Sequence, residues 1–141
     1  GKQEAELVTG GGAHEKHEEE GGFWVKPTIF TEDDNQNDEI ARDEIFGPVL
    51  SVMKVSDLDE AIEVGNDTFY GLAAGVWTSD ISKAHRAAKE LQAGTVWINT
   101  YNQFDPAVPF GGYKGSGFGR ELGKEAIDLY TQKKSVFINT G

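Results

Sequence analysis

Two histidines in an acidic segment are the first residues whose types and spacing could do chemistry. His14 and His17 are separated by two residues and are flanked by Glu15 and by the acidic run 18–20. Imidazole and carboxylate groups suit zinc or nickel. A third fixed ligand is missing, and residues 13–20 contain no apolar side chain larger than alanine that could hold the segment in place. We therefore interpret it as a solvated acidic loop and expect no metal site.

A glycine-rich segment at residues 110–123, FGGYKGSGFGRELG, invites comparison with phosphate-binding loops. The Walker pattern fails because Lys114 is followed by Gly115 and not by serine or threonine. The dinucleotide pattern fails because Arg120 stands where its third glycine is required. Dense glycine instead allows tight turns and close backbone packing. Aromatic rings precede or interleave these glycines: Phe104, Phe110, Tyr113 and Phe118. Two interpretations stay open, a surface that receives an apolar ligand and a well-packed structural connection.

A carboxylate stands just before an aromatic ring and a Gly-Pro break at residues 44–48, EIFGP. Held at the end of a turn, Glu44 could accept paired hydrogen bonds from vicinal hydroxyls, as in ribose recognition, with Phe46 stacked on a heterocycle. From these residues alone, a solvated surface glutamate is the simpler interpretation.

The composition excludes several classes of site. The chain has 141 residues, and its 13 basic and 24 acidic side chains give a net charge of −11 at pH 7. Because the basic residues are scattered among carboxylates, we expect no nucleic-acid partner. The cysteine count is zero, which excludes disulfides, thiolate metal sites and a cysteine nucleophile within these residues. No apolar run reaches the roughly 18 residues that a membrane span needs, and no leader is evident, so we expect a cytoplasmic protein without a membrane partner.

Strands and helices are predicted to alternate along the chain. The strands are expected at residues 5–9, 23–30, 49–55, 72–78, 95–99 and 135–139, the third of them buried. The helices are expected as one turn at 40–41, as 58–65 capped by Ser56 or Asp57, as 81–91 capped by Ser79 or Asp80, and as 122–130, with a long loop over 100–119. This alternation predicts an α/β fold with a layered, partly parallel sheet and flanking helices.

Four sequence runs together point to one family. They are EIFGPVLSV at 44–52, NDTFYGLAAGVWT at 66–78, GTVWIN at 94–99 and PFGGYKGSGFGRELG at 109–123. In order and spacing they resemble the C-terminal part of NAD(P)-dependent aldehyde dehydrogenases. The resemblance implies that residues 1–131 form the C-terminal half of a catalytic domain and that residues 132–141 form an oligomerisation tail.

The resemblance implies a parent enzyme that oxidises aldehydes to carboxylic acids with NAD or NADP. In this family a cysteine thiolate attacks the carbonyl, hydride passes to the nicotinamide, and a glutamate-activated water hydrolyses the thioester. Both of those residues precede the matching stretch in the full enzyme. We therefore expect no catalytic residue in this chain and no activity from it alone.

Binding residues follow from the same resemblance. Glu44 matches the glutamate that binds the nicotinamide ribose hydroxyls, and Phe46 matches the aromatic residue beside that ribose. Phe104 and Phe110 match substrate-tunnel aromatics. Tyr101 and Phe104 would suit apolar, aromatic or quaternary ammonium aldehydes alike, so the aldehyde stays open, as does the choice between NAD and NADP.

The C-terminal segment at 132–139 matches the tail that joins the sheet of a neighbouring subunit. It implies a homo-oligomer, either a dimer or a dimer of dimers. The expected partners are thus a small aldehyde, the remainder of the parent enzyme and further copies of it. The alternative is a stand-alone binding or assembly module that keeps the fold without catalysis.

Overall fold

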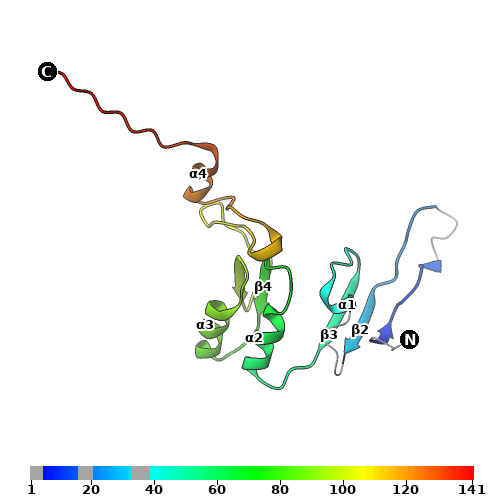
Figure 1. Ribbon diagram of the computed structural model, residues 1–141. Coiled ribbons are helices and arrows are strands. Elements are labelled where there is room, and N and C mark those ends of the chain that lie inside the picture. Colours follow the sequence, from blue (N-terminus) through cyan, green and yellow to red (C-terminus); the bar gives the residue numbers. More distant parts are fainter. Residues whose placement is uncertain (1–4, 16–20, 33–38) are drawn as a thin grey trace. The chain divides into compact units, whose positions relative to one another are not determined.

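The computed structural model describes residues 5–15, 21–32 and 39–141. The chain divides into two compact units, Gly1–Val64 and Gly65–Gly141, and each is described by itself (Figure 1). The predicted boundary between residues 131 and 132 falls inside the second unit, and that division stays a prediction. His17 and the acidic run 18–20 lie outside the described residues.

The first unit is built on a three-stranded sheet of β1 (Glu6–Thr9), β2 (Thr28–Glu32) and β3 (Val49–Met53). The central strand β2 runs antiparallel to β1 and parallel to β3. A short helix, α1 (Glu39–Arg42), precedes β3, and the hydroxyl of Ser51 donates to the carbonyl of Ile40 at 2.9 Å. The prediction of a partly parallel sheet is confirmed.

Three details of this sheet were not predicted from the sequence. The strand expected from residue 23 begins only at Thr28, because Pro27 has no N–H to donate to a ladder. The pairing of β1 with β2 is irregular between Leu7 and Thr9. In the turn that follows, Gly10 has φ +85°, and a Cβ on this residue would overlap the carbonyl of Pro27. The strand β3, predicted to be buried, leaves Leu50 56% exposed, because no described element of this unit covers that face.

A reciprocal cap begins α2 (Leu58–Asn66) at the predicted residue. The carboxylate of Asp57 accepts the N–H of Glu60 at 2.9 Å. In return, the carboxylate of Glu60 accepts the N–H and the hydroxyl of Ser56, both at 2.6 Å. The hydrogen bonds from the Ser56 hydroxyl and N–H favour the charged form and lower the pKa of Glu60.

The second unit contains two parallel strands, β4 (Ala73–Val76) and β5 (Thr95–Ile98), joined through α3 (Ile81–Glu90). Asp80 caps α3 as predicted, accepting the N–H groups of Ser82 at 2.8 Å and Lys83 at 3.2 Å. The helix buries Ala84 and Ala87 and packs against β5. This strand-helix-strand arrangement agrees with the sequence prediction, and the mixed α/β class is confirmed.

The helix predicted over 122–130 is broken. Leu122 and Gly123 both have φ +59°, a left-handed conformation that a right-handed α-helix does not contain. Only the short 3-10 helix η3 (Lys124–Ala126) and α4 (Ile127–Tyr130) follow. A further 3-10 turn, η2 (Lys114–Ser116), lies inside the long loop predicted over residues 100–119.

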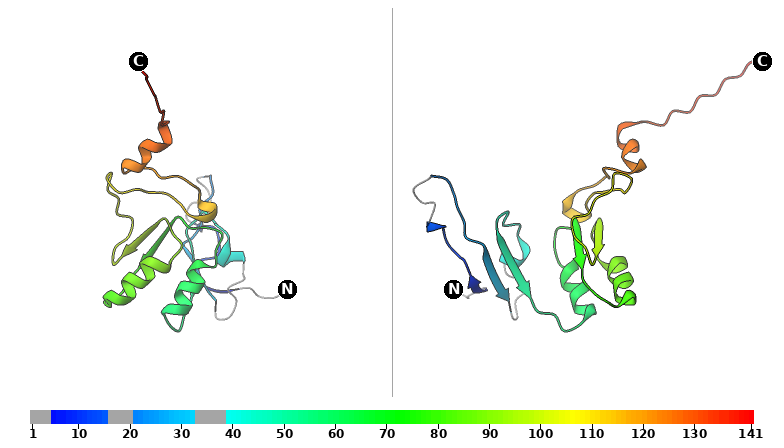
Figure 2. Two further views of the ribbon diagram at one scale, coloured as in Figure 1. Left: turned by 60° about the vertical axis from the view of Figure 1, so that its left-hand side comes forward. Right: turned by 180° about the vertical axis from the view of Figure 1, so that it is seen from behind.

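The strand predicted at 135–139 is not formed in the described structure. Residues 131–141, at the red end of the colour scale, run as a single extended chain (Figure 2). The side chains of Val136, Phe137 and Ile138 are 68%, 96% and 80% exposed. A strand needs a second edge to bond its backbone groups, and no described residue of this chain supplies one.

Among the described helices, none has the length and apolar character required to cross a membrane.

Candidate functional site

A cluster of aromatic rings in the second unit contains both predicted substrate-tunnel residues. Its members are Trp77, Trp97, Tyr101, Phe104 and Phe110. Trp97 lies at the centre, 8% exposed, with its ring centroid 5.1 Å from Tyr101 and 5.7 Å from Phe104. Phe104 in turn meets Phe110 edge to face at 5.1 Å. We call these five rings the aromatic cluster.

Hydrogen bonds just beyond the ends of β4 and β5 hold the start of the loop that carries two of the rings. Asn99 follows β5 at φ +54°, and its side-chain amide makes two bonds of 2.8 Å with the backbone of Thr78, donating to the carbonyl and accepting from the N–H. The indole N–H of Trp97 donates to the carbonyl of Gln103 at 2.9 Å, which folds the next loop back over β5. Tyr101 and Phe104 are carried on that loop.

A hairpin over residues 110–121 positions the last ring. Phe110 and Glu121 form an antiparallel pair, each N–H donating to the other's carbonyl at 2.7 Å. The guanidinium of Arg120 donates to the carbonyls of Gly112 at 3.0 Å and Gly119 at 2.6 Å, and lies 5.3 Å from the centre of the Tyr113 ring. The hairpin is therefore a packed connection that also displays Phe110. The other interpretation of its sequence, a surface that receives an apolar ligand, stays a prediction.

The cluster presents an accessible apolar surface. Tyr101 is 60% and Phe104 is 53% exposed, whereas Trp97 beneath them is buried. Edge-to-face rings of this kind attract apolar and aromatic groups, and their faces also attract cations. The tyrosine hydroxyl is the cluster's only titratable group, so the arrangement is suited to binding and not to nucleophilic attack. Phe118, 101% exposed, makes no ring contact with the cluster among the described residues.

Sequence reasoning missed the two tryptophans as parts of the site. Trp97 was read only as a strand residue, although it alternates with Val96 and Ile98 along β5. Gly75 lies opposite Trp97 in the strand register, and a Cβ there would stand 2.9 Å from the Trp77 ring and 3.1 Å from the Tyr101 ring. The sequence signal that could have predicted this packing is Gly75, because a glycine within a strand leaves room for neighbouring rings.

The predicted cofactor residues lie in the first unit, between α1 and β3. Glu44 is exposed and makes no hydrogen bond to another described residue. Phe46 has φ +54°, which is costly for a residue with a Cβ, and its side chain is 92% exposed. A free carboxylate and an open aromatic ring two residues apart are chemically suited to a ribose and an attached heterocycle.

Two other candidates carry less chemistry. Within residues 5–15, 21–32 and 39–141, no group of three or more His, Asp or Glu side chains gathers in a way that could hold a metal ion. A pocket of about 180 Å³ lies beside Asn66, Tyr70 and Leu91 and is lined by no Asp, Glu, Lys, Arg or His. It is smaller than the roughly 300 Å³ at which ligand sites begin.

Comparison with known families gives a match over almost the whole chain. The sequence model of the Aldehyde dehydrogenase family matches residues 1–136. A betaine aldehyde dehydrogenase of Mesorhizobium japonicum is 51% identical over 142 residues, which cover 100% of this chain and 29% of that protein. A mitochondrial aldehyde dehydrogenase of Leishmania tarentolae is 50% identical, covering 96% of this chain and 26% of that protein.

Solved structures agree with the sequence comparison. A mutant of the indole-3-acetaldehyde dehydrogenase AldA of P. syringae, in complex with NAD+ and IAA, superposes with a TM-score of 0.88 at 51% identity. The match covers 95% of this chain and 26% of that one. An aldehyde dehydrogenase of Mycobacterium tuberculosis in complex with NAD+ gives a TM-score of 0.85 at 46% identity. The chain thus spans less than a third of the length of the relatives that it matches.

Proposed function

The chain belongs to the aldehyde dehydrogenase family, and we propose that it forms the C-terminal part of an enzyme that oxidises aldehydes to carboxylic acids with NAD or NADP. The position rests on the order and spacing of the runs at 44–52, 66–78, 94–99 and 109–123. One observation carries the function: Phe104 and Phe110, the two rings expected to line a substrate tunnel, lie in edge-to-face contact at an accessible surface.

The aromatic cluster would receive the remote end of the aldehyde. Relatives of this chain are named for betaine aldehyde and for indole-3-acetaldehyde. The first substrate carries a quaternary ammonium group and the second an aromatic ring, and exposed faces of Tyr101 and Phe104 suit either. Apolar contact with this remote end orients the substrate without taking part in bond making.

Glu44 and Phe46 would hold the nicotinamide end of the cofactor, which when bound accepts the hydride. The exposed carboxylate of Glu44 would accept hydrogen bonds from the two ribose hydroxyls, and charge-assisted bonds of this kind are stronger than neutral ones. The exposed ring of Phe46 would limit the tilt of the adjoining heterocycle. Together these residues would restrict the cofactor to one pose.

The nucleophile would then come from the remainder of the enzyme, since the chain has no cysteine. The resemblance implies that the general-base glutamate lies there as well. Large exposed apolar side chains support the need for further polypeptide, among them Phe23 at 103% and Leu50 at 56%. In the intact enzyme the two small sheets would belong to one layered catalytic domain, with residues 132–141 pairing as an oligomerisation strand in a cytoplasmic homo-oligomer.

The test isolates the native polypeptide that contains this sequence and measures its intact mass, its reduction of NAD+ and NADP+ with aldehydes, and the same activities of the 141-residue chain alone. We expect a polypeptide several times longer that is active and a chain alone that is inactive. A native product no longer than this chain, without dehydrogenase activity, would instead establish the stand-alone binding or assembly module. Dehydrogenase activity of the chain alone would refute the assignment of the nucleophile to the remainder.

A further inference from the structure

The tip of the glycine-rich hairpin is clasped to the segment that connects α2 to β4. The N–H of Tyr113 donates to the carbonyl of Gly71 at 2.8 Å, and the N–H of Gly115 donates to the carbonyl of Phe69 at 3.0 Å. The hydroxyl of Ser116 accepts the N–H of Gly71 at 2.9 Å. We call residues 66–71 and 113–116, joined by these bonds, the clasp.

Lys114 adds the one cation of the clasp. Its ammonium group donates to the carbonyl of Asn66 at 2.6 Å and to the carbonyl of Thr68 at 3.3 Å. Asn66 is the last residue of α2, and carbonyls at a helix C-terminus carry partial negative charge that attracts a cation. Lys114 itself has φ +50°, so its backbone is held in a conformation that costs free energy unless surrounding contacts stabilise it.

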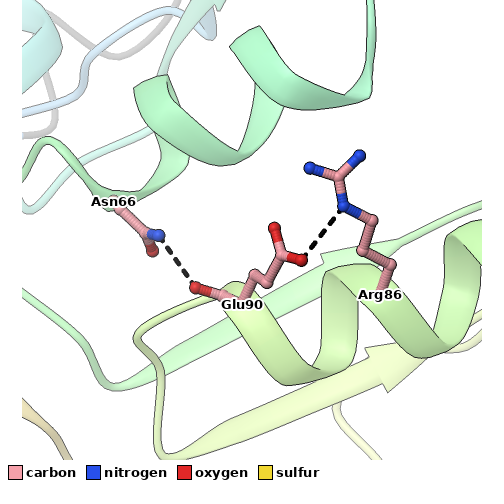
Figure 3. Close-up of polar contacts among 3 residues, drawn as sticks. All are labelled: Asn66, Arg86 and Glu90. Atoms are coloured by element: carbon pink, nitrogen blue, oxygen red, sulfur yellow. Dashed lines mark hydrogen bonds and ion pairs between the residues drawn. The ribbon is translucent and has the colours of Figure 1, made fainter.

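Asn66 is hydrogen-bonded to the end of α3 and to the residues that follow it. Its side-chain amide donates to the carbonyl of Glu90 at 2.9 Å (Figure 3). The same amide accepts the N–H of Gln92 at 2.7 Å. The carboxylate of Glu90 is also bonded to Arg86 at 3.0 Å. Lys114 therefore fastens the hairpin tip to the place where the ends of α2 and α3 meet.

The hairpin transmits this attachment to the aromatic cluster. Its base is the reciprocal pair of Phe110 and Glu121, and Arg120 bonds across it to the carbonyl of Gly112. Next to Phe110, the carbonyl of Gly111 packs so closely on Gly94 that a Cβ there would overlap it. The backbone of Phe110 thus lies at one end of a bonded hairpin whose other end is held in the clasp.

We propose that Lys114 is a positioning residue for the substrate site: its ammonium group, bound by the carbonyls of Asn66 and Thr68, sets the hairpin and with it the angle at which Phe110 meets Phe104 and the aldehyde. This inference rests on the proposed function, because aldehyde selectivity is its readout. Lys114 lies outside the aromatic cluster and acts on the substrate only through Phe110.

The test compares K114M, which keeps length but removes the donors, with K114R, which keeps a cation, and with K83M on the exposed face of α3 as a matched control. In the intact enzyme, kcat/KM is measured for phenylacetaldehyde and for acetaldehyde. For K114M we expect the ratio of the two values to change by roughly 2- to 30-fold, the range of coupling that remote residues show. K114R should restore most of the wild-type ratio, and K83M should leave it unchanged.

A double-mutant cycle separates positioning from general damage. In an F110L background the target of Lys114 is altered, so adding K114M should change the selectivity ratio little further. Equal falls for both aldehydes, identical effects of K114M and K114R, or a full additional change on top of F110L would each overturn the proposal.

Failure of the proposed function is seen separately, as a wild-type protein that reduces neither NAD+ nor NADP+ with any aldehyde.

Near-ultraviolet circular dichroism of the same proteins reports on the packing of the aromatic cluster. K114M should alter that signal and K83M should not, and an unchanged K114M spectrum would overturn the inference on its own.

Discussion

The rings of Phe104 and Phe110 meet edge to face, with centroids 5.1 Å apart and planes inclined by 81°. Phe104 comes from the loop that follows β5, and Phe110 comes from the base of the hairpin at 110–121. The contact therefore joins two separately anchored segments at the surface of the second unit. Replacing either ring should therefore first change the binding of a ligand that contacts the pair.

Replacing Phe104 with alanine should change which aldehydes the intact enzyme prefers. The lost apolar contact lies at the remote end of the substrate, so bulky aldehydes should lose roughly 10-fold or more in kcat/KM relative to short ones. The measurement is kcat/KM across short, long, aromatic and cationic aldehydes, with Phe118→Ala as control, since among the described residues that ring makes no contact with the aromatic cluster. A uniform fall across the panel would indicate packing damage and would remove Phe104 from the substrate site.

Replacing Glu44 with glutamine should weaken the hold on the nicotinamide ribose. Hydrogen bonds to a charged acceptor contribute about 1.5 to 3 kcal/mol, so cofactor affinity or the hydride-transfer rate should fall by about tenfold or more. Pre-steady-state reduction of the cofactor and its binding constant are the measurements, and Asp43→Asn next to it is the control. If both variants behave like the wild type, Glu44 is a surface carboxylate.

Replacing Glu60 with glutamine should flatten the acid dependence of stability. The hydrogen bonds from Ser56 lower the pKa of Glu60 below its ordinary value near 4.5, so the folded state binds this proton more weakly than the unfolded state does. The contribution is complete above that ordinary value and is lost as the pH falls through the lowered one. Urea midpoints measured downward from about pH 6 should therefore drop less for Glu60→Gln than for the wild type.

The control for that experiment is Glu63→Gln, which removes an exposed carboxylate from the same helix outside the cap. Its midpoint should follow the wild-type pH dependence. Parallel curves for all three proteins would mean that the cap formed by Ser56, Asp57 and Glu60 does not persist in solution.

Replacing Gly94 with alanine should destabilise the second unit. A Cβ at Gly94 would overlap the backbone carbonyl of Gly111, which is not a flexible side chain and must move as a whole. Overpacking of this kind costs about 1 to 3 kcal/mol in the free energy of unfolding. Gly12→Ala is the control, because no heavy atom lies within 4 Å of a Cβ there. Equal denaturation midpoints for the two variants would contradict the close approach.

Deleting residues 132–141 from the intact enzyme should shift it towards monomers in light scattering and lower its thermal midpoint. The exposed Val136, Phe137 and Ile138 would otherwise be covered when a partner sheet receives the tail. Deleting only residues 140 and 141 is the control and should change neither value. An unchanged mass and midpoint after the longer deletion would show that the tail is not an assembly strand.

Local signals in the sequence were sufficient for most elements. The helix caps were predicted as Ser56 or Asp57 and as Ser79 or Asp80, and Asp57 and Asp80 are the residues whose carboxylates accept the first N–H groups. These caps were predictable because a cap depends on residues only two or three places away. The strands β4 and β5 and the helix between them were likewise predicted, since each follows from periodicity over a short window. Predictions failed for local and for non-local reasons. The left-handed conformation of Leu122 and Gly123 breaks the helix predicted over 122–130, whereas the tail at 135–139 lacks, among the described residues, the second sheet edge that its backbone needs.

The sequence by itself determined the family, which the family model matches over residues 1–136, and the resemblance predicted Phe104 and Phe110 as substrate-tunnel residues. Only the tertiary structure decided that Trp97 is the centre of the aromatic cluster and that Lys114 fastens the hairpin tip to the end of α2. The physical reason is the distance along the chain. A ring stack or an ammonium group on helix carbonyls joins residues up to 48 positions apart, and such contacts exist only once β4, β5 and their connections have packed.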